Sequence, residues 1–395
     1  MKEESKLVPK LRFPEFRDAW GWECEKVDAL VYTITPPKKL PTSNYGLNGA
    51  FPIIDQSQNE ICGWTDDHEA LIQDDLPFII FGDHTCILKF VRQPFAQGAD
   101  GIKILKSRST VSIAYLYQYL NYQPVVTEEY KRHFSILKEK VVSFPDFKTG
   151  EQQKIAECLS SLDELIAAQA RKVDALKTHK KGLMQQLFPR EGETQPRLRF
   201  PEFRGAGDWD KAKLGDIVEI WSGNSPSKYA LSDSGEYAFV KVEDLNNCTK
   251  YQNHGREYCD DSDDVIPIGA ILFPKRGASI ELNKIRITES EILIDTNLMA
   301  LSPAAKVKVE FLYYFLVNVG LAQIADLSTI PQINNKHIIP FKIVLPSKLE
   351  QQRIADCLTS LDDLITAATQ ELETLKTHKK GLMQQLFPSA AELAA

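Results

Sequence analysis

Asp83 and His84, in the sequence GDHT, pair a carboxylate with an imidazole, two groups that commonly move protons in catalysis. With a divalent metal beside them, they would suit a nuclease. We favour a turn with a hydrogen-bonded histidine, or a histidine at a base edge. The sequence contains no Gly-x-Gly-x-x-Gly, P-loop or His-Glu-x-x-His motif. We therefore predict no catalytic residue and no metal ligand on this chain.

Loops in both halves of the chain are rich in Asn, Gln, Lys, Arg and His. Such side chains can hydrogen-bond to base edges in the major groove, and the cations among them can bind phosphates. An ordinary solvated loop residue is the alternative at every single position. We predict that double-stranded DNA binds a set drawn from both halves: Gln56, Gln58, His84, Lys89, Lys103, Arg132, His133, Lys138, Lys275, Arg276, Asn283, Lys284, Gln332, Asn334, Asn335 and Lys336.

The overall charge argues mildly against this interface, because the formal net charge is −7 and nucleic-acid-binding domains are typically basic. The charge is uneven, however: residues 101–140 hold seven Lys or Arg against three Glu. Seven cysteines without Cys-x-x-Cys spacing favour reduced thiols in a cytoplasmic protein over a zinc site. No apolar run is long enough for a membrane span, and the first residues do not resemble a signal peptide.

The element that must position these loops is a repeated segment. Residues 151–189 recur at 350–388, at a constant offset of 199 residues, and the last fourteen positions are identical. In both copies apolar residues step by four and three, which predicts a long coiled-coil helix that the Leu-Phe-Pro sequence ends. The predicted seam consists of Ile155, Leu159, Leu162, Ile166, Val173, Leu176, Leu183, Ile354, Leu358, Leu361, Ile365, Leu372, Leu375 and Leu382.

We expect the two helices to pair with each other as antiparallel partners within one chain. A homodimeric coiled coil is the alternative. The tag LRFPEF precedes each half, at 11–16 and 198–203, so repeat symmetry predicts that the chain's two ends meet as the central junction does. The predicted segments are 1–150, 151–189, 190–349, 350–388 and a tail at 389–395.

The two bodies that precede these helices, residues 21–148 and 210–349, share a plan but little sequence. Patterns of apolar residues predict strands and helices in each body. The predicted strands are 51–54, 78–81, 86–90, 237–242, 270–273, 285–287 and 341–345; the predicted helices are 111–122 and 309–324. The fold class is therefore α+β: two mixed α/β domains separated by a long antiparallel two-helix coiled coil, with pseudo-two-fold symmetry.

Taken together, these motifs resemble the specificity (S) subunit of type I restriction–modification systems (the HsdS family). The resemblance covers the whole chain and rests on both tags and both helices. It also rests on body motifs: Asp55-Gln56, FGDHT at 81–85, AQGADG at 96–101, FPKRGA at 273–278, DTN at 295–297 and STIPQI at 328–333.

The resemblance implies two target-recognition domains that read the halves of an asymmetric bipartite DNA site, and a helix pair that sets the spacer between them. It also implies a non-catalytic chain that binds two methyltransferase (M) subunits, which carry S-adenosylmethionine. Restriction–translocase (R) subunits, which use ATP and Mg²⁺, would then join. A protein-binding scaffold, the nuclease above and a degenerate S subunit that no longer binds its methyltransferase remain alternatives.

Overall fold

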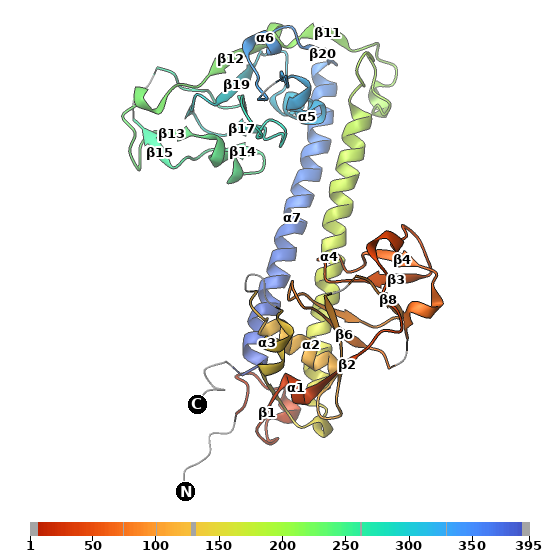
Figure 1. The fold of residues 1–395 in the computed structure, drawn as a ribbon. Helices are drawn as coiled ribbons and strands as arrows, with labels where there is room; N and C mark the ends of the chain where they lie inside the picture. Colours follow the sequence, from red (N-terminus) through yellow and green to blue (C-terminus); the bar gives the residue numbers. More distant parts are fainter. Residues whose placement is uncertain are drawn as a thin grey trace. The chain divides into compact units, whose positions relative to one another are not determined.

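The computed structural model describes residues 7–73, 75–99, 101–127, 132–260, 263–328 and 330–388 (Figure 1). The chain divides into two compact units. Unit 1 combines residues 1–171 with 370–395, and unit 2 contains residues 172–369. The predicted tail at 389–395 lies outside the described residues, as do Asp100 and Thr329 of the sequence motifs.

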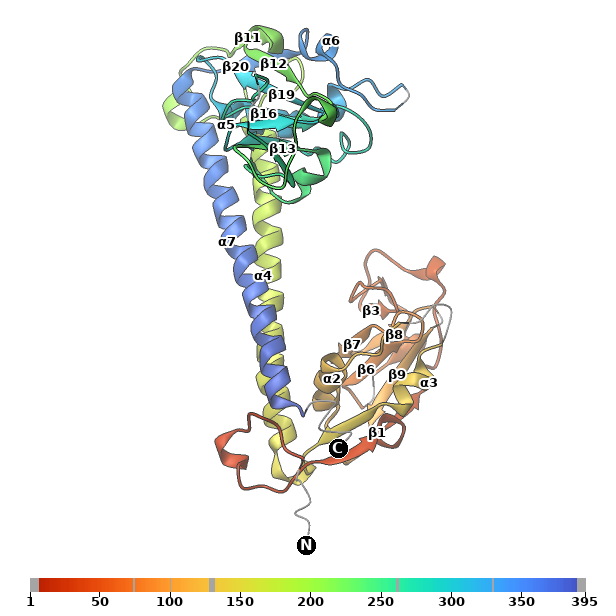
Figure 2. The same ribbon diagram turned by 90° about the vertical axis from the view of Figure 1, so that its left-hand side faces the viewer.

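Two long helices contribute to both units. Helix α4 runs from Glu151 to Leu187 and helix α7 from Lys348 to Leu386, so both predicted helices are confirmed. Within unit 1 the Gln169 side chain bonds Glu371 and the Lys379 side chain bonds Asp163, a pairing order that requires antiparallel helices. The two ribbons lie side by side in both views (Figure 1 and Figure 2). The chain therefore pairs its own helices, as expected.

The predicted seam is buried most deeply near the start of each helix. Ile155 and Leu159 belong to the core of the first body, and Ile354 and Leu358 belong to the core of the second. Of the remaining seam positions, two are also buried and eight are half-buried: Val173 and Leu372, then Leu162, Ile166, Leu176, Leu183, Leu361, Ile365, Leu375 and Leu382. The helix pair thus buries its seam partly against the bodies.

The first body contains two four-stranded sheets. One has the order β2-β9-β6-β7 and the other β4-β3-β8-β5. Their strands are β2 (Val31–Ile34), β3 (Phe51–Ile54), β4 (Gly63–Thr65), β5 (Leu71–Ile72), β6 (Phe78–Gly82), β7 (Leu88–Val91), β8 (Phe95–Gln97) and β9 (Ile102–Ser107). The remaining elements are α1 (Val27–Leu30), α2 (Ile113–Tyr122), α3 (Phe134–Glu139) and the paired strands β1 (Glu23–Lys26) and β10 (Val141–Phe144).

The second body repeats this topology. Its sheets have the orders β12-β19-β16-β17-β14 and β15-β13-β18. Their strands are β12 (Val218–Ser222), β13 (Tyr237–Val240), β14 (Tyr251–Gln252), β15 (Glu257–Cys259), β16 (Ile271–Pro274), β17 (Arg286–Thr288), β18 (Ile292–Ile294) and β19 (Leu298–Pro303). The remaining elements are α5 (Val309–Val319), α6 (Asn335–Ile338) and the paired strands β11 (Asp210–Lys213) and β20 (Lys342–Leu345).

Within these sheets, seven strands of each body correspond, whereas β5 of the first body and β14 of the second have no counterpart. Strand β6 lies between β9 and β7, just as β16 lies between β19 and β17. The parallel pair β3–β8 likewise matches the parallel pair β13–β18. The mixed α/β character of both bodies is therefore confirmed. Their strand orders are similar although their sequences have little in common.

One predicted helix is too long. The sequence pattern extends from 309 to 324, but α5 ends at Val319. Gly320 then adopts a positive φ of 84°, which is incompatible with a continuing right-handed helix. A 3₁₀ turn, Leu321–Gln323, follows, so apolar periodicity alone did not reveal the break.

The C-terminal end of each long helix is buried in a body core. Phe387, which follows α7, packs against Tyr115, Tyr119 and Tyr122, with ring centroids 5.2–5.6 Å apart. Phe188, which follows α4, packs against Phe311 at a centroid distance of 5.5 Å. Apolar burial therefore explains why Leu-Phe-Pro ends both copies of the repeat.

The repeated tags close the two joins that symmetry predicted. The Leu198 N–H donates to the Gln186 carbonyl at 2.9 Å, and the Leu11 N–H donates to the Gln385 carbonyl at 2.9 Å. The tag arginine then binds the first glutamate of the Glu-Gln-Gln motif: Arg12 pairs with Glu151, and Arg199 with Glu350. The predicted meeting of the N-terminal tag with the end of α7 is thus confirmed.

Candidate nucleic-acid interface

The first candidate surface begins where strand β6 ends. The Gln56 side-chain oxygen accepts a hydrogen bond from the His84 backbone N–H at 3.3 Å. The Thr85 hydroxyl donates to the Gln56 carbonyl at 2.8 Å. Gly101 has a φ of +100°, and a Cβ there would lie 2.5 Å from the Gln56 side chain, so only glycine fits. These contacts bring the Gln56 and His84 loops together, and Gln58 is exposed in the same loop as Gln56.

Asp83 joins a third segment to these loops. Its carbonyl accepts the His133 N–H at 2.9 Å, and its carboxylate accepts the Phe134 N–H at 2.8 Å. The ammonium groups of Lys103 and Lys138 lie 5.4 and 5.5 Å from the centre of the Phe134 ring. The structure therefore gathers five predicted positions from distant parts of the sequence: Gln56, His84, Lys103, Arg132 and Lys138.

Two predicted DNA contacts in this body must be corrected. The His133 side chain is 1% exposed, with Nδ1 3.0 Å from the Asp83 carbonyl oxygen. Lys89 is 6% exposed, and its ammonium donates to the Asn59 carbonyl. Both side chains point into the body, where each makes a hydrogen bond to a backbone carbonyl. Their bonds hold loops in place, and neither side chain has the surface exposure that a DNA contact requires.

The Asp83–His84 pair does not form an acid–base couple in this structure. Asp83 is 5% exposed, and its carboxylate is bonded to the first N–H group of α3. His84 is exposed. The two side chains therefore lie in different environments, which favours the turn interpretation over the nuclease.

The second candidate surface begins where β16 ends. Arg276 forms a β-bridge with Gln332, and the Lys275 carbonyl accepts the Ile333 N–H at 2.9 Å. Asn334 caps α6, where its own N–H donates to His337 Nδ1 at 3.1 Å. Burial, and then the charge of Arg276, lowers the pKa of Lys275. Lys275, Arg276, Gln332 and Asn334 thus converge on one edge, beside the exposed Asn335 and Lys336.

The Asn283 side chain is bonded within the body, whereas the DNA contact of Lys284 stays a prediction. Asn283 has a φ of 51°, and its amide donates to the Val317 carbonyl and accepts the Leu321 N–H, each at 3.0 Å. Lys284 donates to the Asn246 side chain at 2.7 Å. The Asn283 side chain is thus a turn support at the end of α5, which corrects its assignment as a DNA contact.

The two surfaces occupy equivalent places. Each follows the corresponding strand, β6 or β16, and contacts the segment before a short helix, α3 or α6. The side chains differ: Gln56, His84 and Arg132 in one body, but Lys275, Arg276 and Gln332 in the other. The same scaffold therefore presents two different sets of hydrogen-bonding groups.

The network that supports the Gln56 loop could not be found from the sequence. The Cys62 thiol donates to the Asp55 carboxylate at 2.7 Å, and the Tyr45 hydroxyl donates to the same carboxylate at 3.3 Å. Burial raises the pKa of the Tyr45 hydroxyl. These residues belong to separate turns, and their spacing matches no motif.

Within the described ranges, no group of three His, Cys, Asp or Glu residues is placed to hold a metal ion. No helix among the residues described is long and apolar enough to cross a bilayer.

Comparison with known proteins shows what the second half of the chain is similar to. Residues 206–377 match the family model for the type I restriction modification DNA specificity domain. They include most of the second body and most of α7, and they confirm the resemblance to type I specificity subunits.

Curated proteins similar to this chain are described as type I restriction enzyme specificity subunits. The putative type I restriction enzyme MjaX specificity subunit of Methanocaldococcus jannaschii is 27% identical over 265 residues. That match covers 64% of this chain but only 59% of the relative. The EcoR124I/EcoR124II specificity subunit of Escherichia coli is 25% identical over 350 residues, 81% of either chain.

Solved structures show that the specificity-domain fold extends over the whole chain. The type I S subunit of M. genitalium has a TM-score of 0.64 at 18% identity, with 97% of this chain and all of that one covered. A chain from work on complex assembly and conformational transition of the type I R-M system has a TM-score of 0.55 at 16% identity. It covers 93% of this chain and 98% of that one. At these identities the likeness concerns the fold, and it supports two mixed α/β bodies with a long helix pair.

Proposed function

We propose that this chain is the DNA sequence-specificity subunit of a type I restriction–modification complex. Each body reads one half of an asymmetric bipartite site in double-stranded DNA, and the helix pair sets the spacer. The chain itself performs no chemistry. Methylation would come from two M subunits that carry S-adenosylmethionine, and cleavage from R subunits that use ATP and Mg²⁺.

One observation carries this proposal: equivalent loops of two bodies with the same topology present different side chains. The β6 loop presents Gln56 and His84, whereas the β16 loop presents Lys275 and Arg276. Arg and Lys favour guanine in the major groove, and Gln favours adenine. A duplicated scaffold with divergent readers suits a site whose halves differ.

The repeated helix ends suit a pair of identical partners. The fourteen identical residues that end α4 also end α7, and they expose the same lysines, Lys177 and Lys181 in one copy and Lys376 and Lys380 in the other. A surface that occurs twice offers two equivalent docking places. Two M subunits would fill them.

The test is modification-sensitive sequencing of DNA from cells that express the chain with its methyltransferase. We expect methylated adenine at one split, asymmetric motif that disappears when the gene is removed. An unchanged methylation pattern, together with duplex DNA binding that does not weaken as salt increases, would favour the protein-binding scaffold instead.

Single variants test the half-site recognition of the two bodies separately. Arg276→Ala should relax the sequence requirement in one half of the motif only, because the body with His84 is untouched. His84→Ala should relax the other half only. Loss of a base contact costs about 1–3 kcal/mol, so sites with one mismatched base should become methylated.

A further inference from the structure

A lysine of one long helix pairs with an aspartate of the other at two equivalent places. In unit 2, Lys180 of α4 binds Asp362 of α7. In unit 1, Lys379 of α7 binds Asp163 of α4 at 2.6 Å. The two lysines are 199 residues apart in the sequence, as are the two aspartates, so the repeat places the same ion pair in both units.

Each aspartate also binds the body of its own unit. The Tyr314 hydroxyl of α5 donates to Asp362 Oδ2 at 2.6 Å, while Lys180 uses Oδ1. The Gln118 amide of α2 donates to Asp163 Oδ2 at 2.8 Å, while Lys379 uses Oδ1. Each carboxylate therefore holds the opposite helix with one oxygen and a body helix with the other. We call this three-way contact of an aspartate, the lysine of the opposite long helix and a side chain of a body helix the joint. The body side chain is Tyr314 in unit 2 and Gln118 in unit 1, but the arrangement is the same.

The joint in unit 2 is partly shielded from water, with side-chain exposures of 16% for Lys180 and 26% for Asp362. Tyr314 is fully buried, and the Lys180 ammonium lies 5.1 Å from the centre of its ring. Lys250 adds a second donor, with its ammonium 3.0 Å from both the Tyr314 and the Thr359 hydroxyl oxygens. Burial lowers the pKa of Lys250. Hydrogen bonds to a charged acceptor are stronger than neutral ones, and more so away from water.

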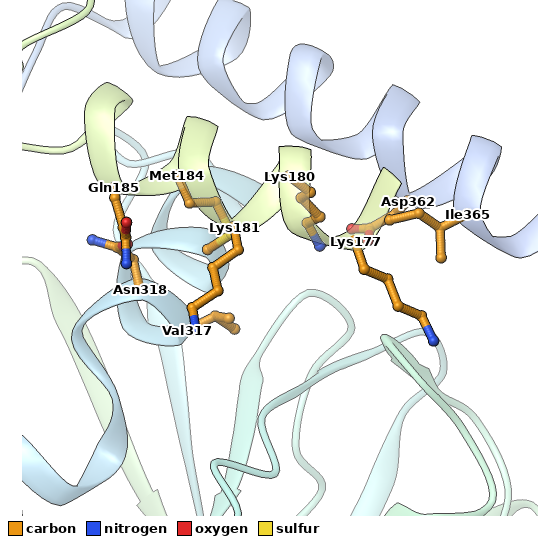
Figure 3. A pocket seen from close by; sticks show the side chains of 9 residues that line it. All are labelled: Lys177, Lys180, Lys181, Met184, Gln185, Val317, Asn318, Asp362 and Ile365. Atoms are coloured by element: carbon orange, nitrogen blue, oxygen red, sulfur yellow. Dashed lines mark hydrogen bonds and ion pairs between the residues drawn. The ribbon is translucent and has the colours of Figure 1, made fainter. Parts of the chain in front are cut away.

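Figure 3 shows Lys180 and Asp362 on their two helices, with Val317 and Asn318 of α5 farther along, next to Lys181 and Gln185 of α4. These residues line a groove of about 450 Å³. Side chains of α5, α4 and α7 thus line the same groove. A change at this point alters how the body is held against the helix pair.

We propose that Asp163 and Asp362 are positioning residues that fix each recognition body to the helix pair and so determine which spacer lengths the chain accepts. This inference rests on the proposed function. A body held only by apolar packing can rock on the helices, and its reading loops would then reach half-sites at other separations. A carboxylate bonded in two directions at once suppresses that movement.

The test compares methylation of DNA targets that contain both half-sites with the natural spacer, or with one base pair more or less. Asp362→Asn removes the charge, and the amide cannot accept bonds on both sides. Tyr314→Phe removes the bond between Asp362 and the body, together with the hydroxyl's contacts to Lys250 and Thr359, and leaves the Lys180–Asp362 ion pair in place. Both variants should raise methylation at off-length spacers relative to the natural spacer by about tenfold, the effect of one lost bond to a charged group. Asp163→Asn should do the same.

Matched controls separate positioning from stability. Lys154→Met removes an exposed ion pair with Glu15, away from the reading loops and the repeated helix ends, and should leave the spacer preference unchanged. Thermal unfolding verifies that each variant is folded. The bases recognised in each half-site should stay the same, since no reading loop is altered.

Two results would overturn the inference. One is a wild-type spacer preference in folded Asp362→Asn and Tyr314→Phe proteins. The other is loss of methylation at every spacer in Asp362→Asn while Tyr314→Phe behaves as wild type. If the wild-type chain directs no methylation at any split motif, the proposed function fails and the inference fails with it.

Discussion

At the scale of single residues, the tag arginines have the clearest energetic role. Arg199 binds Glu350 through two nitrogens at 2.7 Å each, and the Glu350 side chain is 1% exposed. Arg199→Met would leave that carboxylate buried without its charge partner. We expect the free energy of unfolding to fall by about 3–5 kcal/mol, measured by urea denaturation.

The matched control for this variant is Arg353→Met. Arg353 binds Glu202 at 3.1 Å, but both side chains are about half exposed. An exposed pair contributes about 0–1 kcal/mol, so this variant should unfold near the wild type. Equal losses in the two variants would contradict the importance of burial.

Tyr117 provides a pH-dependent prediction. Burial, and then the charge of Asp163, raises the pKa of Tyr117 to about 12. In the unfolded chain this hydroxyl ionises near pH 10, so above that pH the unfolded state has lost a proton that the folded state keeps. Stability therefore falls as pH rises through this window. Relative to Tyr117→Phe, the wild type should lose about 1.4 kcal/mol by pH 11, measured by denaturation at pH 9 and 11.

At the scale of elements, two glycines at helix ends should respond in opposite directions. Gly182 lies inside α4, and a Cβ there would meet nothing within 4 Å. Gly182→Ala should stabilise the protein by about 0.5–1 kcal/mol, because alanine favours the helix. Gly320→Ala should destabilise it by about 1–2 kcal/mol, because its φ of 84° is unfavourable for a residue with a Cβ. Thermal unfolding of both variants gives the two signs.

The length of the helix pair should control the spacer. Four residues inserted after Ala168 would lengthen α4 by about 6 Å at 1.5 Å per residue, nearly two base pairs of DNA. They would also rotate the seam, because four is not a full heptad. We expect the methylated motif to gain a longer spacer, as read by sequencing.

The same four residues placed in the linker at 190–196 provide the control. That segment lies outside both helices, so the spacer should not change. An unchanged spacer after the Ala168 insertion would contradict the role of the helices as a ruler.

At the scale of the whole molecule, the two joins predict a circular permutation. The join of Leu11 to Gln385 repeats the join of Leu198 to Gln186, with the same 2.9 Å backbone bond. A chain opened in the 190–196 linker, with residue 388 connected to residue 7 by a copy of that linker, should keep its fold. We expect the same methylated motif; a permutant that fails to fold would contradict the equivalence of the joins.

Sequence patterns predict both long helices, one further helix in each body, the tags and seven of the twenty strands in the described residues, because these depend on periodicity and on repeats that neighbouring residues carry. The bounds of α4 and of β3 agree with the predicted ranges. The loops that contain Gln56, His84, Arg276 and Gln332 were also selected as candidate DNA-binding loops by residue type. Residue type and periodicity can be read from a sequence because they do not depend on contacts between distant segments.

Which of these residues meet, and which are buried, depends on how segments distant in the sequence pack together. His133 and Lys89 have the chemistry of DNA contacts, but the packing around them turns both side chains inward. The joint at Asp163 depends on Gln118 and Lys379, which come from separate segments of the chain. No local pattern encodes such a contact, since the hydrogen-bond geometry exists only after the helices have packed.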